Sequence, residues 1–436
     1  MYPNFGLSGF CYYHINVTRN LFSKGLLAVL PCFFVLILTA CSTDDENVGA
    51  GQFATKPVAP KEDDDPMAPR ITSTVRYAES KMTAYNFEYP STDPYGNPVM
   101  LSGAITIGDE VKPRQRARGL MLYNHFTVFR ADECPSRGEL TAQKIIVGSG
   151  LITVSADYYG FGATEDKLQA YCMSRQNAQA SVDALLAAKK LLPKMGYLWN
   201  DDVLFNIGYS EGGQTTMGVV RLIDEKYPDL HLTYSIAGGG SYDIPETYRQ
   251  FIRAEISGMP STVVHVLLTY NEYFNLGIPR DRLFIEPVLS NIDDWFISMK
   301  HTRVEIDEEL IGSLDIDKFV TPEIQDLNSE LSQRILEKLD TDNLCKGWTP
   351  RQDERILLVH HKADITVPVG NANNLYYFLS TEQGMKNVDL NMKDWGSMRG
   401  LSAHDTGAVY FMLGAVNKVC LTLSILPWFN PFDIDI

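Results

Sequence analysis

Short runs of consecutive apolar residues alternate with longer stretches of helical periodicity from residue 117 onward. Uninterrupted apolar runs are typical of parallel strands that are covered by helices on both faces. This alternation predicts an α/β fold with a mostly parallel central sheet flanked by helices. The predicted strands are residues 119–123, 151–154, 203–207, 232–237, 356–359 and 388–390, and the predicted helices are residues 176–192 and 212–225.

An antiparallel hairpin is predicted at one edge of this sheet. Residues 76–88 and 99–107 alternate between apolar and polar positions, and the turn sequence Tyr95-Gly96-Asn97-Pro98 lies between them. Alternation of period two on both sides of such a turn predicts two paired strands.

Residues 243–353 interrupt the strand–helix alternation. They are rich in helical patterns, for example at residues 263–274 and 324–339. We therefore expect one domain over residues 71–436, with a helical cap inserted at about residues 243–353.

The N-terminus has the pattern of an export signal. Basic residues precede an apolar run at residues 25–40, which is shorter than the about 20 residues of a membrane-spanning helix. The run ends in Leu38-Thr39-Ala40-Cys41, which resembles the lipobox of bacterial lipoproteins. The resemblance implies a signal peptide over residues 1–40 and a lipid on Cys41. A cysteine in an ordinary signal peptide or membrane anchor is the alternative.

Residues 41–70 are acidic, contain Gly and Pro, and have almost no apolar periodicity, which predicts a flexible tether. The acidic run Asp44-Asp45-Glu46 resembles the surface-export signal of Bacteroidetes-type lipoproteins, and a tether without an address is the alternative. We therefore expect an exported lipoprotein at the outer membrane or cell surface, held to the membrane by its N-terminal lipid.

Charge and cysteine content exclude some functions. The net charge is −16, whereas nucleic-acid binding needs a basic face, so no nucleic-acid partner is expected. The cysteines do not have the spacing of a zinc site, and no metal is expected. Cys134 and Cys172 lie in predicted loops, where they form either a disulfide or free buried thiols.

The candidate nucleophile, Ser210, lies in the run Gly208-Tyr209-Ser210-Glu211-Gly212-Gly213. It lies between a predicted strand and a predicted helix, which is the setting of a G-x-S-x-G nucleophile elbow. Flanking glycines are needed there because side chains would collide with the strand and helix. A glycine-rich turn with Ser210 as a helix N-cap is the alternative.

A serine nucleophile needs a base, and the base needs an acid to orient it. In folds that contain a nucleophile elbow, the serine comes first along the chain, the acid second and the histidine last. The candidate base is His404, which lies in a loop before a C-terminal helical run. The candidate acid is Asp364, which follows the strand at residues 356–359. Asp394 and Asp405 are the alternative acids.

An oxyanion hole is expected from two backbone N–H groups. Glu211 supplies one at the start of the helix, and Phe126 or Thr127 supplies the other from the loop after residues 119–123. This catalysis requires no cofactor.

Together these motifs resemble the α/β-hydrolases, and within them the secretory-lipase-like branch, over most of the chain from about residue 75. Where such proteins often have a glycine in the oxyanion loop, this chain has Phe126. The motifs that carry the resemblance are residues 124–127, 157–162, 208–213, 237–243 and 364–368, together with His404.

The resemblance implies hydrolysis of carboxylic esters through an acyl-enzyme, with Ser210 as nucleophile, His404 as base and Asp364 as acid. The substrate is then a small-molecule, lipid or glycan ester. A serine peptidase on the same fold is one alternative, since the triad does not distinguish esters from amides. A non-catalytic binding lipoprotein is the other.

Overall fold

The computed structural model describes residues 65–138 and 140–425. The predicted signal peptide, Cys41 and the tether as far as residue 64 lie outside the described residues.

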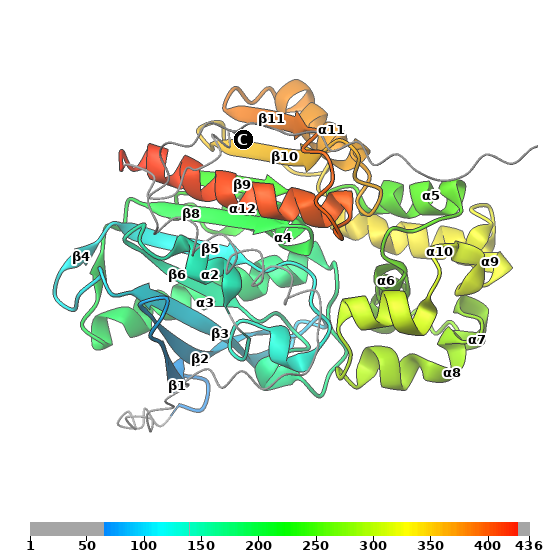
Figure 1. Cartoon of the computed structure of the whole chain (residues 1–436), viewed down its shortest axis with the longest axis horizontal. Helices are drawn as coiled ribbons and strands as arrows, with labels where there is room; N and C mark the ends of the chain where they lie inside the picture. Colours follow the sequence, from blue (N-terminus) through cyan, green and yellow to red (C-terminus); the bar gives the residue numbers. More distant parts are fainter. Residues whose placement is uncertain (1–64, 139, 426–436) are drawn as a thin grey trace, which may run out of the picture. The chain divides into compact units, whose positions relative to one another are not determined.

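In the described part of the chain, nine strands form one sheet in the order β1-β2-β3-β6-β5-β8-β9-β10-β11 (Figure 1). Neighbours from β1 to β6 in this order pair antiparallel, and all later neighbours pair parallel. The expected α/β fold with a mostly parallel sheet is thereby confirmed. The strands are β1 (Arg70–Tyr77), β2 (Met82–Thr92), β3 (Pro98–Gly108), β5 (Gly119–Asn124), β6 (Leu151–Ala156), β8 (Leu204–Tyr209), β9 (Tyr234–Gly238), β10 (Ile356–His361) and β11 (Val388–Lys393). A separate parallel ladder joins β4 (Arg116–Ala117) to β7 (Leu198–Trp199).

Helices cover both faces of the sheet. The helices α3 (Ser174–Lys194) and α4 (Glu211–Lys226) pack on one face, and α2 (Thr141–Ile146) and α12 (Ala403–Thr422) pack on the other (Figure 1). The helix α11 (Gly370–Tyr377) connects β10 to β11. Because both faces are covered, every residue of β5, β6, β8, β9 and β10 is buried, which explains their uninterrupted apolar runs.

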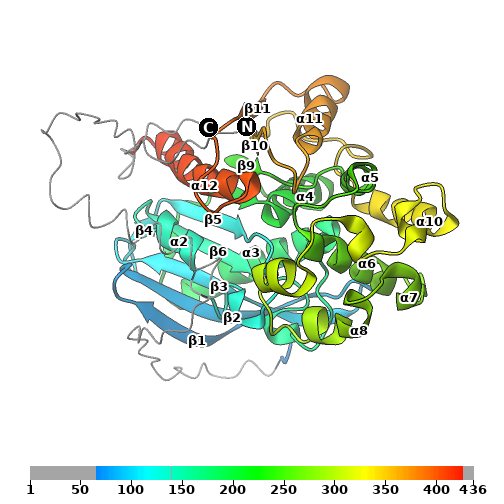
Figure 2. The ribbon, with the colours of Figure 1, turned by 45° about the vertical axis from the view of Figure 1, so that its right-hand side comes forward.

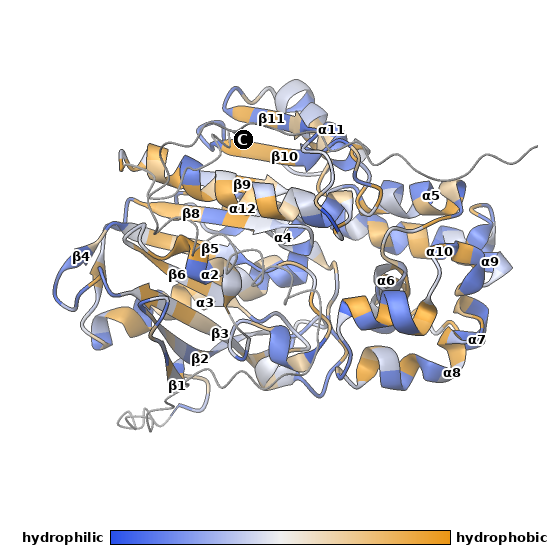
Figure 3. Cartoon of the chain, in the orientation of Figure 1, coloured by the Kyte–Doolittle hydropathy of each residue, from blue (hydrophilic) through white to orange (hydrophobic). Residues whose placement is uncertain are grey.

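The residues between β9 and β10, which we call the cap, are helical. Both views place these helices together beside the ends of the strands (Figure 1 and Figure 2). Apolar residues concentrate on the central strands, whereas the cap helices alternate between apolar and polar positions (Figure 3). The cap helices are α5 (Ile244–Ala254), α6 (Pro260–Tyr273), α7 (Arg280–Leu283), α8 (Val288–Ile292), α9 (Pro322–Gln325) and α10 (Glu330–Leu339), with π-helical turns at Asp293–Ile297 and Glu305–Ile311.

Two predicted elements are each divided in the structure. The predicted hairpin is confirmed, since β2 pairs antiparallel with β3, but the expected strand at residues 76–88 starts too early: β1 ends at Tyr77 and β2 starts at Met82, after a turn in which Lys81 has φ 50°. The helix expected over residues 324–339 is also wrong, because Ser329 caps a new helix by accepting a hydrogen bond from the Ser332 N–H. Local turn and capping chemistry therefore overrides the apolar periodicity at both places.

The suspected Cys134–Cys172 disulfide is not formed, and both residues are buried free thiols. Cys134 packs in a small cluster with Val128 and Phe161, whereas Cys172 faces a different cavity, described below. Among the described residues, no helix is both long enough and apolar enough to cross a membrane.

Candidate active site

Ser210 occupies a strained turn between β8 and α4. Its backbone has φ 59° and ψ −124°, a region that non-glycine residues rarely adopt. The Ser210 N–H donates to the Gly238 carbonyl on β9 at 2.8 Å, which helps to hold the turn. This is the geometry that a nucleophile elbow requires, since it lifts the hydroxyl clear of the sheet.

The glycines of the elbow are required by close backbone contacts. A Cβ on Gly212 would lie 2.1 Å from the Asn124 carbonyl oxygen, and a Cβ on Gly208 would lie 2.2 Å from the Gly212 carbonyl oxygen. A Cβ on Gly213 would lie 2.3 Å from the Gly238 carbonyl oxygen. The start of α4 therefore packs directly against β5 and β9, with no room for side chains.

His404 reaches Ser210 from the first turn of α12. Its Nε2 lies 2.8 Å from the Ser210 Oγ. Two contacts fix this helix end: Ser402 caps it by accepting from the Asp405 N–H at 3.0 Å, and the Tyr209 hydroxyl donates to the His404 carbonyl at 2.8 Å. Tyr209 directly precedes Ser210, so one residue contributes to the positions of both Ser210 and His404.

Asp364 lies in the loop after β10, and its Oδ2 is 2.6 Å from the His404 Nδ1. Its Oδ1 accepts hydrogen bonds from the Thr366 and Val367 N–H groups, each at 2.9 Å. His360 adds a contact, since its Nε2 lies 3.5 Å from the Asp364 Oδ2 and 2.8 Å from the Val367 carbonyl. The carboxylate is thus held on both oxygens.

The alternative acids lie elsewhere. Asp394 accepts from the Gly396 N–H at 2.9 Å, and Asp405 accepts from the Ser402 hydroxyl at 2.7 Å. The Asp405 Oδ1 also lies 3.7 Å from the Arg303 Nη2 in the cap. The structure therefore brings Asp364, and neither alternative, to the imidazole nitrogen that faces away from Ser210.

The pKa values of His404 and Asp364 are shifted in the directions that favour a charged imidazolium beside a charged carboxylate. Burial lowers the pKa of His404, but the Asp364 charge and hydrogen bond outweigh burial, so the pKa is raised above 6.5. Burial raises the pKa of Asp364, but His404 and His360 outweigh it and hold that pKa well below its usual range. An imidazolium formed by proton transfer from Ser210 would therefore be stabilised.

The two segments expected to form the oxyanion hole are the start of α4 and the loop after β5. Glu211 is the first residue of α4, so its N–H has no acceptor within the helix. Thr127 is buried and lines the cavity beside Ser210, whereas the Phe126 side chain is 39% exposed. Of the two loop residues, Thr127 is the one that lines the cavity.

A cavity of about 610 Å³, part of it open to solvent, extends from Ser210 beneath the cap. Its walls near Ser210 are formed by Thr127, Tyr171, Cys172, Glu211 and Ser241. No sequence motif marked the cap residues that line it, because they are ordinary positions on amphipathic helices. They are mainly apolar and include Ile244, Tyr248, Phe251, Met259, Val263, Val266 and Leu339.

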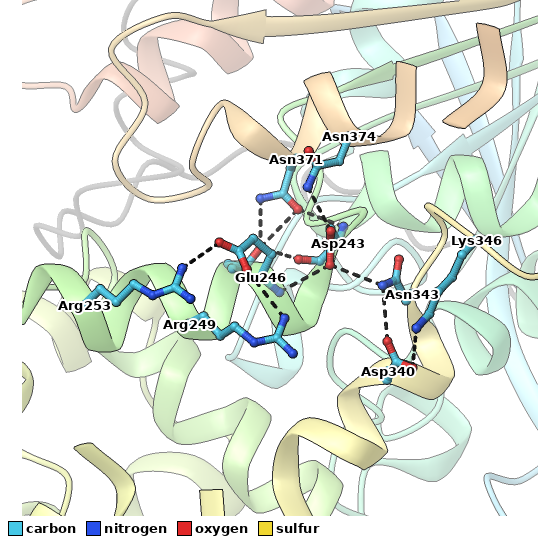
Figure 4. A network of polar contacts seen from close by, with 10 residues as sticks. Asp243, Glu246, Arg249, Arg253, Asp340, Asn343, Lys346, Asn371 and Asn374 are labelled. Atoms are coloured by element: carbon cyan, nitrogen blue, oxygen red, sulfur yellow. Dashed lines mark hydrogen bonds and ion pairs between the residues drawn. The ribbon is translucent and has the colours of Figure 1, made fainter. Parts of the chain in front are cut away.

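A polar network fixes the start of the cap beside this cavity (Figure 4). Asp243 caps α5 and accepts from Asn374 of α11 at 2.9 Å and from Asn343 at 3.3 Å. Asn371 of α11 donates to the Thr247 hydroxyl at 2.8 Å, and Thr247 lines the cavity. The cap is therefore attached to the helix that follows the Asp364 loop.

Within the described residues, no cluster of three or more His, Cys, Asp or Glu side chains could hold a metal ion.

Comparisons with known proteins agree with this fold. Residues 139–397 match the sequence model of the secretory lipase family. No curated protein sequence matches the chain.

Several solved structures are similar to this chain, at identities that establish the fold alone. A putative hydrolase from Legionella pneumophila is 24% identical over 78% of this chain and 89% of its own, with a TM-score of 0.67. The rice cell wall degrading esterase LipA from Xanthomonas oryzae is 22% identical over 79% and 91%, with a TM-score of 0.64. Candida antarctica lipase A in its closed state is 16% identical over 85% and 83%, with a TM-score of 0.57.

The elbow contacts generate a prediction for Gly212→Ala. The added Cβ meets backbone rather than a movable side chain, so we expect a loss of about 1–3 kcal/mol in the free energy of unfolding together with lost activity. Urea denaturation and ester hydrolysis measure the two effects. Gly370→Ala is the control, because its Cβ would meet only the flexible Gln250 side chain at 3.1 Å. Equal stability and activity in the two variants would contradict the steric argument.

Proposed function

Since this chain belongs to the secretory lipase family, we propose that it is a serine hydrolase that cleaves carboxylic esters through an acyl-enzyme. The observation that carries the proposal is the continuous contact from the Ser210 Oγ through His404 to Asp364, at 2.8 Å and 2.6 Å. The strained backbone of Ser210 supports it, since an ordinary helix cap would not need that conformation.

The proposed reaction has two halves. Ser210 attacks the ester carbonyl while the His404 Nε2 takes its proton, and Asp364 holds the imidazole in the required tautomer. The N–H groups of Glu211 and Thr127 stabilise the oxyanion, and His404 then protonates the departing alcohol. Water, activated by His404, attacks the acyl-enzyme, releasing the acid and restoring Ser210.

The cavity indicates the substrate's chemistry. Glu211 is the one acidic or basic residue among the described residues that line it, and burial raises the pKa of Glu211 to about 8. The cavity is therefore uncharged at neutral pH and apolar beneath the cap. We infer that the group it receives is uncharged, since burying an unpaired charge is costly.

No observation specifically favours the peptidase alternative. A purely binding role would not require Ser210, His404 and Asp364 to be in contact.

The proposal extends to the cellular location. We propose that residues 1–40 direct export, that Cys41 carries a lipid, and that residues 41–70 tether the hydrolase domain of residues 71–436. The match to the secretory lipase family supports export, and the pattern that ends in Cys41 supports the lipid anchor.

The acid assignment predicts different effects for two variants. Asp364→Asn should lower kcat about 10³–10⁴-fold, because its amide can keep the two backbone hydrogen bonds but presents the wrong partner to His404. Asp394→Asn should retain most activity. Steady-state hydrolysis of a nitrophenyl ester measures both. Ser210→Ala gives the background activity, and circular dichroism verifies folding. If Asp394→Asn loses its activity and Asp364→Asn keeps it, the acid is Asp394.

The same assay has an expected pH dependence. His404 must be neutral to accept the proton, and its pKa in the site is raised. The kcat/KM should therefore fall as pH decreases through this pKa, with the midpoint of the acid-side fall above 6.5.

The uncharged cavity predicts selectivity between matched substrates. Nitrophenyl hexanoate and the mono-nitrophenyl ester of adipic acid have six-carbon acyl chains that differ by a terminal carboxylate. We expect kcat/KM to be at least about tenfold higher for the neutral ester, because the cavity offers no cation. Equal values would show that the acyl group does not enter it.

The Cys41 assignment predicts a change in membrane association. Cys41→Ser removes the thiol that accepts the lipid, so the protein should leave the membrane fraction or remain unprocessed. Metabolic labelling with a fatty-acid analogue, followed by fractionation, measures this. If Cys41→Ser incorporates no fatty-acid label but still partitions completely into membranes, a different segment anchors the protein.

A further inference from the structure

The cavity wall beside the nucleophile is a short segment, Tyr171-Cys172, just before α3. Cys172 is buried with φ 55°, a backbone conformation that costs free energy in a non-glycine residue. Such a conformation persists only where surrounding contacts hold it.

The Glu211 side chain holds one end of this segment. Its Oε1 accepts from the Cys172 N–H at 3.2 Å and from the Asn177 Nδ2 at 3.1 Å. Glu211 is 5% exposed and is the residue after the nucleophile. The contact therefore joins the elbow directly to the wall and to the start of α3.

Tyr171 holds the other end. Its hydroxyl lies 3.0 Å from the Thr127 Oγ1, and its ring packs edge-on against Phe129, 5.5 Å between centroids. On the opposite side of the segment, the Tyr270 hydroxyl of α6 donates to the Cys172 carbonyl at 3.1 Å. The wall is thus fixed to the loop after β5 as well as to the elbow.

These contacts bridge the two donors of the oxyanion hole. The Glu211 and Thr127 N–H groups come from separate segments, and an oxyanion hole needs both at about 3 Å from one oxygen. We propose that the Glu211 carboxyl group and the Tyr171 hydroxyl are positioning groups that set the distance between these donors through the Tyr171-Cys172 wall. This inference rests on the proposed esterase function.

The acid–base state of Glu211 gives the inference a distinctive readout. The titratable groups that face it are Tyr158, Tyr171 and Cys172, and burial keeps all three neutral by raising their pKa values. Burial likewise raises the pKa of Glu211 to about 8. Below that pH the carboxyl group is neutral. Above it, a negative charge would lie beside the developing oxyanion and slow the reaction.

Glu211 and Tyr171 are tested by substitution in the full-length protein. Tyr171→Phe and Glu211→Ala should each lower kcat about tenfold, a partial loss of oxyanion stabilisation, while KM changes less than about twofold. Phosphonylation of Ser210 by a fluorophosphonate should slow by a similar factor. Glu211→Gln should recover most of the loss, because its amide oxygen can accept both hydrogen bonds.

The pH profile separates positioning from general destabilisation. The wild-type kcat should fall above about pH 8, and Glu211→Gln should lack this alkaline decline. Glu354→Gln is the matched control, since Glu354 is also buried with a pKa raised to about 7 but lies before β10, outside the cavity. Tyr197→Phe controls for loss of a hydroxyl–hydroxyl contact, which Tyr197 makes to Tyr85 at 3.2 Å.

The outcomes distinguish this inference from the esterase proposal. Unchanged kcat and phosphonylation rates in Tyr171→Phe and Glu211→Ala would overturn the inference and leave the esterase intact. An alkaline decline that persists in Glu211→Gln would also overturn it. A wild-type protein that hydrolyses no ester would refute the proposed function, and the phosphonylation rates would then still decide whether the wall sets the oxyanion hole.

Discussion

The backbone contact between the elbow and β5 is the constraint on which the rest of the site depends. Gly212 approaches the Asn124 carbonyl too closely for any side chain. This contact lies in the first turn of α4, which begins immediately after Ser210. The end of β5 packs against the elbow at this contact, so the loop carrying Thr127 starts close to Ser210. Ser210, Glu211 and the loop carrying Thr127 are therefore placed by one packing arrangement.

The other half of the site depends on Tyr209. Its hydroxyl binds the His404 carbonyl, and a Cβ on Gly407 would lie 2.4 Å from the hydroxyl oxygen. The helix α12 can approach β8 only because Gly407 lacks a side chain. Since Tyr209 adjoins Ser210 in sequence, the same residue connects the elbow to the backbone of His404.

Sequence patterns reveal the parts of the site that backbone geometry dictates. The elbow is visible because its glycines are sterically required. Asp364 and His404 are visible because Asp364 follows a buried apolar run and His404 precedes a C-terminal helical run, in the order that the fold imposes. Phe126 and Thr127 could not be separated in the sequence, since their difference in burial arises only when the loop packs under Tyr171.

Other features leave no sequence signal. The division of residues 76–88 into two strands depends on one turn residue, Lys81, with positive φ. The Glu211 carboxyl and the Tyr171 hydroxyl meet partners that are distant in the chain, so no spacing rule identifies them. The same holds for the cap residues around the cavity, whose periodicity reports only that one face is buried.

The attachment of the cap has a consequence for how such a protein can change over evolutionary time. Asp243, near the start of the cap, binds Asn343, near its end, although the two are 100 positions apart. Entry and exit thus meet at a single point on the scaffold (Figure 4). An insertion with adjoining ends can be lengthened, shortened or exchanged while the sheet keeps its register. The cap residues that line the cavity can therefore change without disturbing the elbow, so the two parts of the site can vary independently.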